Sequence, residues 1–168
     1  MNKIIVEVSI GELLDKISIL EIKQEKIKDA ESLKFIAEEY NVLKAELDKN
    51  IKSDEKLKSL FNSLKEINSK LWVIEDDKRM CEKNKDFGEK FIKLSRDVHF
   101  LNDNRAKIKL EINNHTGSKI KEIKKYTNYW YLYFFSRYFI KLWTKKVINK
   151  YILPAIIKTS TGLKVVEI

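Results

Sequence analysis

Charged residues occupy positions in this sequence where amphipathic helices are normally apolar. Glu21 falls on the apolar face of the first amphipathic stretch, Glu75 and Arg79 continue the apolar seam of a later stretch, and Arg105 lies midway along another. A buried charge costs several kcal/mol unless it is paired. Because the two negative and two positive side chains can neutralise one another, we predict that they form one shared polar cluster. Its expected members are Glu21, Glu75, Arg79 and Arg105, with Asn102 and Lys109 at the edge.

Two interpretations of this cluster remain open from the sequence. It can be a structural ion-pair network that fixes the register of the helices. It can also be a ligand site between facing helices, where two arginines hold an anionic group and a carboxylate acts as a base or binds a second polar group. In the second case the protein is a small-molecule enzyme or binder. The residue types and spacing do not identify a reaction.

Other catalytic chemistry has little support. His99 and His115 are far apart in the sequence, and Cys81 has no expected histidine partner. No Cys/His spacing suggests zinc, and neither a P-loop nor a GxGxxG motif is present. We therefore predict no metal site and no cofactor. A single cysteine also fits a reducing compartment, and no signal peptide is recognisable, so we expect a cytoplasmic protein.

The elements that must position the cluster are helices. The chain has 168 residues with only 4 Gly and 1 Pro, too few turn-formers for a many-stranded sandwich or barrel. Apolar periodicity predicts an all-α fold: an antiparallel bundle of about four long helices, preceded by an extended segment at residues 4–8. Capping boxes at Ser9–Glu12 and at residues 86–89 open the first and fourth helices. Helices two and three are expected at about 31–50 and 54–84, and Gly117 ends the fourth.

Charge divides the chain into two parts near Gly117. Residues 1–118 carry 23 Lys/Arg and 23 Asp/Glu, so this body is neutral. Residues 119–168 carry 11 Lys/Arg against two acidic residues, which accounts for the whole net charge of +9. The same segment holds 11 of the 18 aromatic residues. We therefore predict a helical bundle over residues 1–118 and a basic, aromatic-rich extension over residues 119–168.

The extension contains an amphipathic helical pattern over residues 136–151, with apolar and basic residues on opposite faces, and Pro154 ends it. Such a helix is typical of an anchor at an anionic membrane surface. A fifth helix packed on the bundle and a single-stranded nucleic-acid site are the alternatives, nucleic acid being disfavoured because the aromatics form one continuous run. The expected membrane contacts are Trp130, Phe134, Arg137, Ile140, Lys141, Trp143, Lys145 and Val147.

Four blocks of the body resemble a family of small bacterial proteins known only as a domain of unknown function. The blocks are residues 8–23 (VSIGELLDKISILEIK), 71–79 (LWVIEDDKR), 86–88 with 91–96 (DFG and FIKLSR) and 102–109 (NDNRAKIK). The resemblance covers about residues 4–126 and departs from the family where KEIKKY replaces the usual acidic pair before Lys-Ser-Tyr. It implies a helical fold and an association with genes for cell-surface polysaccharide glycosyltransferases. It implies no known activity, so no catalytic residue is carried over.

These observations lead to two function hypotheses. In the first, the protein is a non-enzymatic interaction or peripheral-membrane accessory protein, linked to cell-surface polysaccharide synthesis, with an anionic membrane surface and a glycosyltransferase or other protein as partners. In the second, the Glu/Arg cluster holds an anionic ligand.

Overall fold

The computed structural model describes residues 5–124, and the chain divides into two units after Lys124. All regular structure in the described part is helical, which confirms the predicted all-α class. Four helices follow one another: α1 (Ile10–Lys26), α2 (Ala30–Asn50), α3 (Glu55–Asn84) and α4 (Glu89–His115). Residues 5–8, expected to be extended, form no strand and are exposed. None of the described helices is long and apolar enough to cross a bilayer.

Local sequence signals account for most helix ends. The Ser9 hydroxyl accepts a hydrogen bond from the Glu12 N–H at 3.2 Å, as predicted for the start of α1. The prediction of a capping box at residues 86–89 is wrong in detail. The N-cap of α4 is Gly88 without a side-chain bond, because the Asp86 carboxylate instead accepts the Gly88 N–H at 3.1 Å. Gly117 follows α4 with a φ of 68°, which confirms its predicted role.

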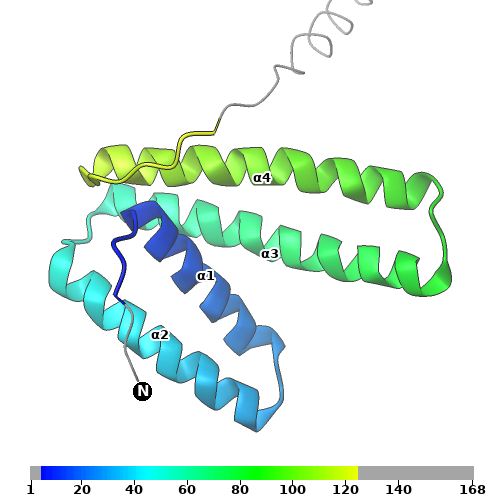
Figure 1. The fold of residues 1–168 in the computed structure, drawn as a ribbon, viewed down its shortest axis with the longest axis horizontal. Helices are drawn as coiled ribbons and strands as arrows, with labels where there is room; N and C mark the ends of the chain where they lie inside the picture. Colours follow the sequence, from blue (N-terminus) through cyan, green and yellow to red (C-terminus); the bar gives the residue numbers. More distant parts are fainter. Residues whose placement is uncertain (1–4, 125–168) are drawn as a thin grey trace, which may run out of the picture. The chain divides into compact units, whose positions relative to one another are not determined.

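Helix α1 is the centre of the described part, because α2, α3 and α4 all pack on it (Figure 1). Helices α3 and α4 lie side by side, whereas α2 contacts only α1 among the described helices. The apolar core between them consists of Leu14, Leu57, Leu64 and Ile112. A helix surrounded on three sides must bury more than one stripe. On α1, the residues Gly11, Asp15, Ser18 and Ile22 form a second buried stripe beside that of Leu14 and Ile17.

Gly11 lets α1 and α4 approach closely. A Cβ atom at this position would lie 2.6 Å from the backbone oxygen of Lys109 and 2.9 Å from Oδ1 of Asn113. The Gly11 N–H donates to that Oδ1 at 2.7 Å. This contact satisfies one free donor of the first turn of α1 and fixes the register in which α1 meets α4.

Candidate functional site

An ion pair between α1 and α4 lies at the centre of the site. Arg105 donates from Nε to Oδ1 of Asp15 at 2.8 Å and from Nη2 to Oδ2. The Asp15 side chain is 5% exposed and that of Arg105 is 27% exposed. The hydrogen bond from Arg105 to Asp15 raises the pKa of Arg105, so the guanidinium stays charged. Two parallel bonds also fix the plane of the guanidinium.

Helix α3 completes this network from the other side. The Nδ2 group of Asn68 donates to Oδ1 of Asp15 and to Oγ of Ser18, each at 2.8 Å, and both Asn68 and Ser18 are buried. Asp15 thereby accepts hydrogen bonds from two helices. Within residues 5–124, no buried side-chain nitrogen or oxygen lacks a partner. The network therefore joins α1, α3 and α4 without leaving a fully buried side-chain nitrogen or oxygen unpaired.

Lys109, expected at the edge of the cluster, forms a second ion pair one turn further along α4. Its ammonium contacts Glu12 on α1 and Oε2 of Glu122, the latter at 3.1 Å. The Lys109 side chain is 9% exposed, whereas both carboxylates are about 40% exposed. Partial burial of Glu122 opposes ionisation, but its hydrogen bonds to Lys124 and Lys109 prevail and lower the pKa to about 2. This pair ties the segment after α4 to α1.

Glu21 lies apart from this network. Its Oε2 pairs with Lys65 on α3 at 2.8 Å, and its Oε1 accepts a weak 3.4 Å bond from the Tyr40 hydroxyl. The hydrogen bond to Glu21 raises the pKa of Lys65. Glu21 borders a narrow cavity of about 130 Å³ between α1, α2 and the start of α3. The predicted cluster is therefore divided: Glu21 belongs to the α2 side of α1 and Arg105 to the α4 side.

The structure does bring Arg105, Glu75 and Arg79 together around one hollow. Figure 1 shows that α1 runs obliquely to α3 and α4. The hollow has a volume of about 410 Å³ and is lined by residues of α1, α3 and α4. We call it the Arg105 hollow. Asn102 does not line it. Its lining residues come from α1, α3 and α4 and are Ile19, Ile22, Asn68, Leu71, Trp72, Glu75, Asp76, Arg79 and Arg105.

Among the three charged residues of α3 that line the hollow, Arg79 and Glu75 are held loosely. Arg79 is 71% exposed, and its one described contact is a 3.4 Å pair with Asp76 on the same helix. Glu75 is 41% exposed and lies 3.8 Å from Lys78. Exposed pairs of this kind contribute about 0–1 kcal/mol to stability. Both side chains are therefore available to a ligand at small cost, unlike Asp15.

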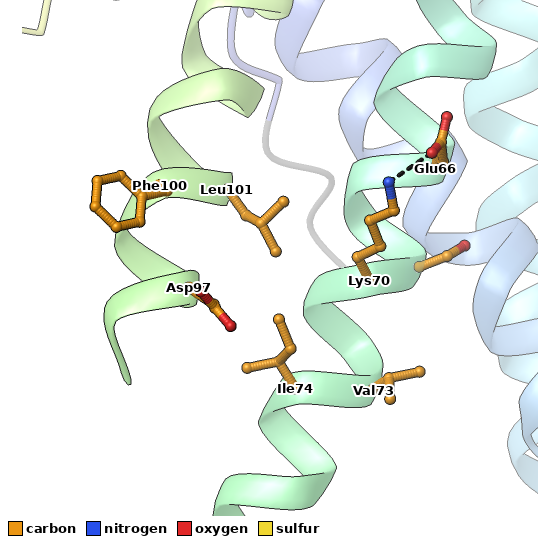
Figure 2. Close-up of a pocket in the computed structure, with 8 residues that line it drawn as sticks. Glu66, Lys70, Val73, Ile74, Asp97, Phe100 and Leu101 are labelled. Carbon is orange, nitrogen blue, oxygen red and sulfur yellow. Dashed lines mark hydrogen bonds and ion pairs between the residues drawn. The ribbon is translucent and has the colours of Figure 1, made fainter. Parts of the chain in front are cut away.

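A second hollow of about 600 Å³ is lined by α3 and α4 alone (Figure 2). Ile74 and Leu101 lie between the two helices, with Asp97 beside them. The Glu66–Lys70 ion pair, at 2.6 Å, borders the hollow on α3. Its apolar lining consists of Val73, Ile74, Phe100 and Leu101.

The sequence prediction missed Asp15, Glu12 and Asn68. The apolar periodicity indicates a single buried face through Leu14 and Ile17, and Asp15 does not lie on that face. The signal that could have revealed it is the spacing of Gly11, Asp15 and Ser18 at i, i+4 and i+7, a stripe of small and polar residues that allows a close helix contact. The expected membrane contacts from Trp130 to Val147 lie outside the described residues.

Over residues 5–124 the fold and the site define an all-helical body in which a buried ion-pair network joins α1, α3 and α4 beside an open hollow. The chain matches a family of unknown function, DUF6165, over residues 4–131. It belongs to this family. No curated protein and no solved structure matches the chain. Within the described residues, no group of three His, Cys, Asp or Glu side chains is arranged as metal ligands would be.

Proposed function

We propose that this protein is a non-enzymatic accessory protein that acts at the inner face of the membrane in cell-surface polysaccharide synthesis. In this role the helical body is a scaffold, and residues 119–168 bind anionic lipid through a basic, aromatic amphipathic helix. The observation that supports the proposal most is the division of charge. The body is neutral over residues 1–118, and the entire excess of +9 follows it.

Pairing inside the body is consistent with a scaffold. The buried Asp15 carboxylate is neutralised by Arg105, and the buried Lys109 ammonium by Glu12 and Glu122. Basic residues near an anionic membrane each contribute about 1 kcal/mol of attraction. The 11 Lys/Arg of residues 119–168 are numerous enough for reversible binding of this kind. The resemblance to proteins associated with glycosyltransferase genes supports such an enzyme as the protein partner.

Vesicle binding of the full chain tests the lipid part of the proposal. We expect sedimentation with vesicles that contain phosphatidylglycerol and little with pure phosphatidylcholine. The triple variant Arg137→Gln, Lys141→Gln and Lys145→Gln should bind about 100-fold more weakly, from roughly 1 kcal/mol for each charge. A matched control removes three exposed lysines of the body, Lys34→Gln, Lys49→Gln and Lys52→Gln. Equal loss in both triple variants, or no loss in the first, would contradict a specific role of the extension.

Two further measurements separate the alternatives. Binding of a single-stranded oligonucleotide that displaces the vesicles would favour a nucleic-acid site. A pull-down with a purified membrane-associated glycosyltransferase tests the protein partner. Loss of capture in the Arg137, Lys141 and Lys145 triple variant would assign the contact to the extension, whereas unchanged capture would assign it to the body.

A second candidate function is binding of a small ligand with an anionic group in the Arg105 hollow. It is favoured because Glu75, Arg79 and Arg105, singled out by their types and spacing, line the same hollow. Its volume of about 410 Å³ lies within the usual range of ligand pockets, roughly 300–1,000 Å³. Ligand-induced stabilisation that persists in the Arg137, Lys141 and Lys145 triple variant would separate this function from membrane binding.

A further inference from the structure

The Arg105 hollow contains two polar atoms with unused hydrogen-bonding capacity. Arg105 uses Nε and Nη2 for Asp15, and Nη1 forms no hydrogen bond within residues 5–124. Asn68 uses its Nδ2 group for Asp15 and Ser18, and its Oδ1 accepts no hydrogen bond in this part of the chain. Both residues line the hollow, and Asn68 is 5% exposed. The residues that line the hollow therefore include one charged donor and one acceptor that the described fold does not use.

Asp15 makes this donor edge rigid. Because Asp15 holds the guanidinium by two bonds, Arg105 keeps its orientation without a ligand. A group that binds Nη1 then loses little entropy in ordering the arginine. Asp15 also neutralises Arg105, so this end of the hollow has no net positive charge to attract a multiply charged anion.

The other lining residues indicate two further properties of the ligand: an apolar part and charges of both signs. Ile22, Leu71 and the indole of Trp72 give the hollow an apolar wall. At the mouth, Glu75 and Asp76 supply two negative charges and Arg79 one positive charge. A ligand that carried only negative charge would meet these two carboxylates, whereas a ligand that carried only positive charge would meet the two arginines. Charge complementarity favours a ligand that carries both signs.

We propose that the Arg105 hollow binds a small zwitterion with an apolar side chain, of the chemical class of a hydrophobic amino acid. Its carboxylate binds Nη1 of Arg105 and the guanidinium of Arg79. Its ammonium group lies near Glu75 and Asp76, and its apolar side chain packs on Trp72. This inference rests on the second proposed function and is independent of membrane binding.

Matched fluorinated ligands test the charge requirement on the full chain by ¹⁹F NMR titration. The probes are 4-fluoro-L-phenylalanine, its N-acetyl derivative with only the negative charge, and its amide with only the positive charge. We expect a dissociation constant on the order of 1 mM for the amino acid, as for a ligand of about a dozen atoms. Each derivative should bind about tenfold more weakly because one charged contact is lost.

The outcomes distinguish two claims: that the hollow binds a small ligand with an anionic group, and that this ligand must be a zwitterion. If the N-acetyl derivative binds as tightly as the amino acid, the hollow binds anions, so the second function stands and the zwitterion requirement is wrong. If the amide binds as tightly as the amino acid, the carboxylate contact is refuted. The titration extends to a probe concentration of ~20 mM, about 20 times the dissociation constant expected for the amino acid. If none of the three probes binds at that concentration, binding of this class of ligand in the hollow is refuted.

Variants of exposed residues locate the binding without disturbing the fold. Arg79→Ala should weaken binding of 4-fluoro-L-phenylalanine about tenfold, because it removes a charged contact from a loosely held side chain. The matched control is Arg96→Ala, an exposed arginine of α4 that does not line the hollow. Glu75→Gln should restore part of the affinity of the N-acetyl derivative by removing a like charge. Equal binding by wild type and Arg79→Ala would overturn the placement in this hollow.

Discussion

Replacing Arg105 by alanine is the most direct test of the buried network. The variant leaves the Asp15 carboxylate, 5% exposed, with only the neutral hydrogen bond from Asn68. Breaking a buried ion pair in this way costs about 3–5 kcal/mol. Arg105 itself is 27% exposed and borders a hollow, so water can enter the vacated space and reach the carboxylate. We therefore expect a loss near the lower end, about 3 kcal/mol.

Urea unfolding followed by circular dichroism measures this loss. With a denaturant dependence of about 2 kcal/mol/M, the midpoint should fall by about 1.5 M. Arg96→Ala, at an exposed position of the same helix, removes only a contact with the Phe100 ring at 6.0 Å and should change the free energy of unfolding by at most about 1 kcal/mol. The double variant Asp15→Asn with Arg105→Ala should be more stable than Arg105→Ala alone, because no stranded charge remains. A midpoint for Arg105→Ala within about 0.3 M of wild type, about 0.6 kcal/mol, would refute the reasoning.

Three further predictions concern the contacts of α4 with α1 and with the segment that follows α4. Gly11→Ala should destabilise the protein by about 1–3 kcal/mol, since its Cβ would lie 2.6 Å from a backbone oxygen, whereas Gly88→Ala should cost less than about 1 kcal/mol in the same urea assay. Lys109→Ala should cost only about 1 kcal/mol, because both partner carboxylates are about 40% exposed and water solvates them; a loss as large as that of Arg105→Ala would contradict this. The fold lowers the pKa of Glu122 from its ordinary value of 4.5 to about 2, so the ionised carboxylate stabilises the fold at any pH above 4.5. The stability difference between wild type and Glu122→Gln should therefore disappear as the pH falls from 4.5 towards 2, and a pH-independent difference would refute it.

Local chemistry made much of the fold predictable. The Ser9 cap and Gly117 depend on residues within one helical turn of the helix end, so their types alone specify the geometry. Long apolar periodicities likewise predict helices over the described body. The capping box at residues 86–89 failed because an aspartate two residues before a glycine can close a local turn instead of capping the helix.

The partner of Arg105 could not be predicted in the same way. Its position on the seam of α4 indicated a buried charge, but any acidic residue on a facing helix would satisfy it. The sequence predicts Glu21 and Glu75 in the same cluster as Arg105, Glu21 because it lies beside Leu14 and Ile17. In the structure Glu21 pairs with Lys65 instead, because α1 contacts three helices and its α4 side is the stripe of Gly11 and Asp15. Which stripe meets which helix depends on how the helices pack, and the pattern of one helix does not contain that information.

The position of Arg105 makes stability and binding separable by mutation. Its guanidinium is bonded to the buried Asp15, and the residue also lines the hollow, so Arg105→Ala disturbs both properties. Arg79 borders the same hollow but is 71% exposed and contributes little to the core. If the network served only to fix helix register, Arg79→Ala would change neither the urea midpoint nor the ¹⁹F titration. A normal midpoint combined with weakened binding can arise only if the hollow holds a ligand, because a purely structural network has no role for an exposed arginine at its mouth.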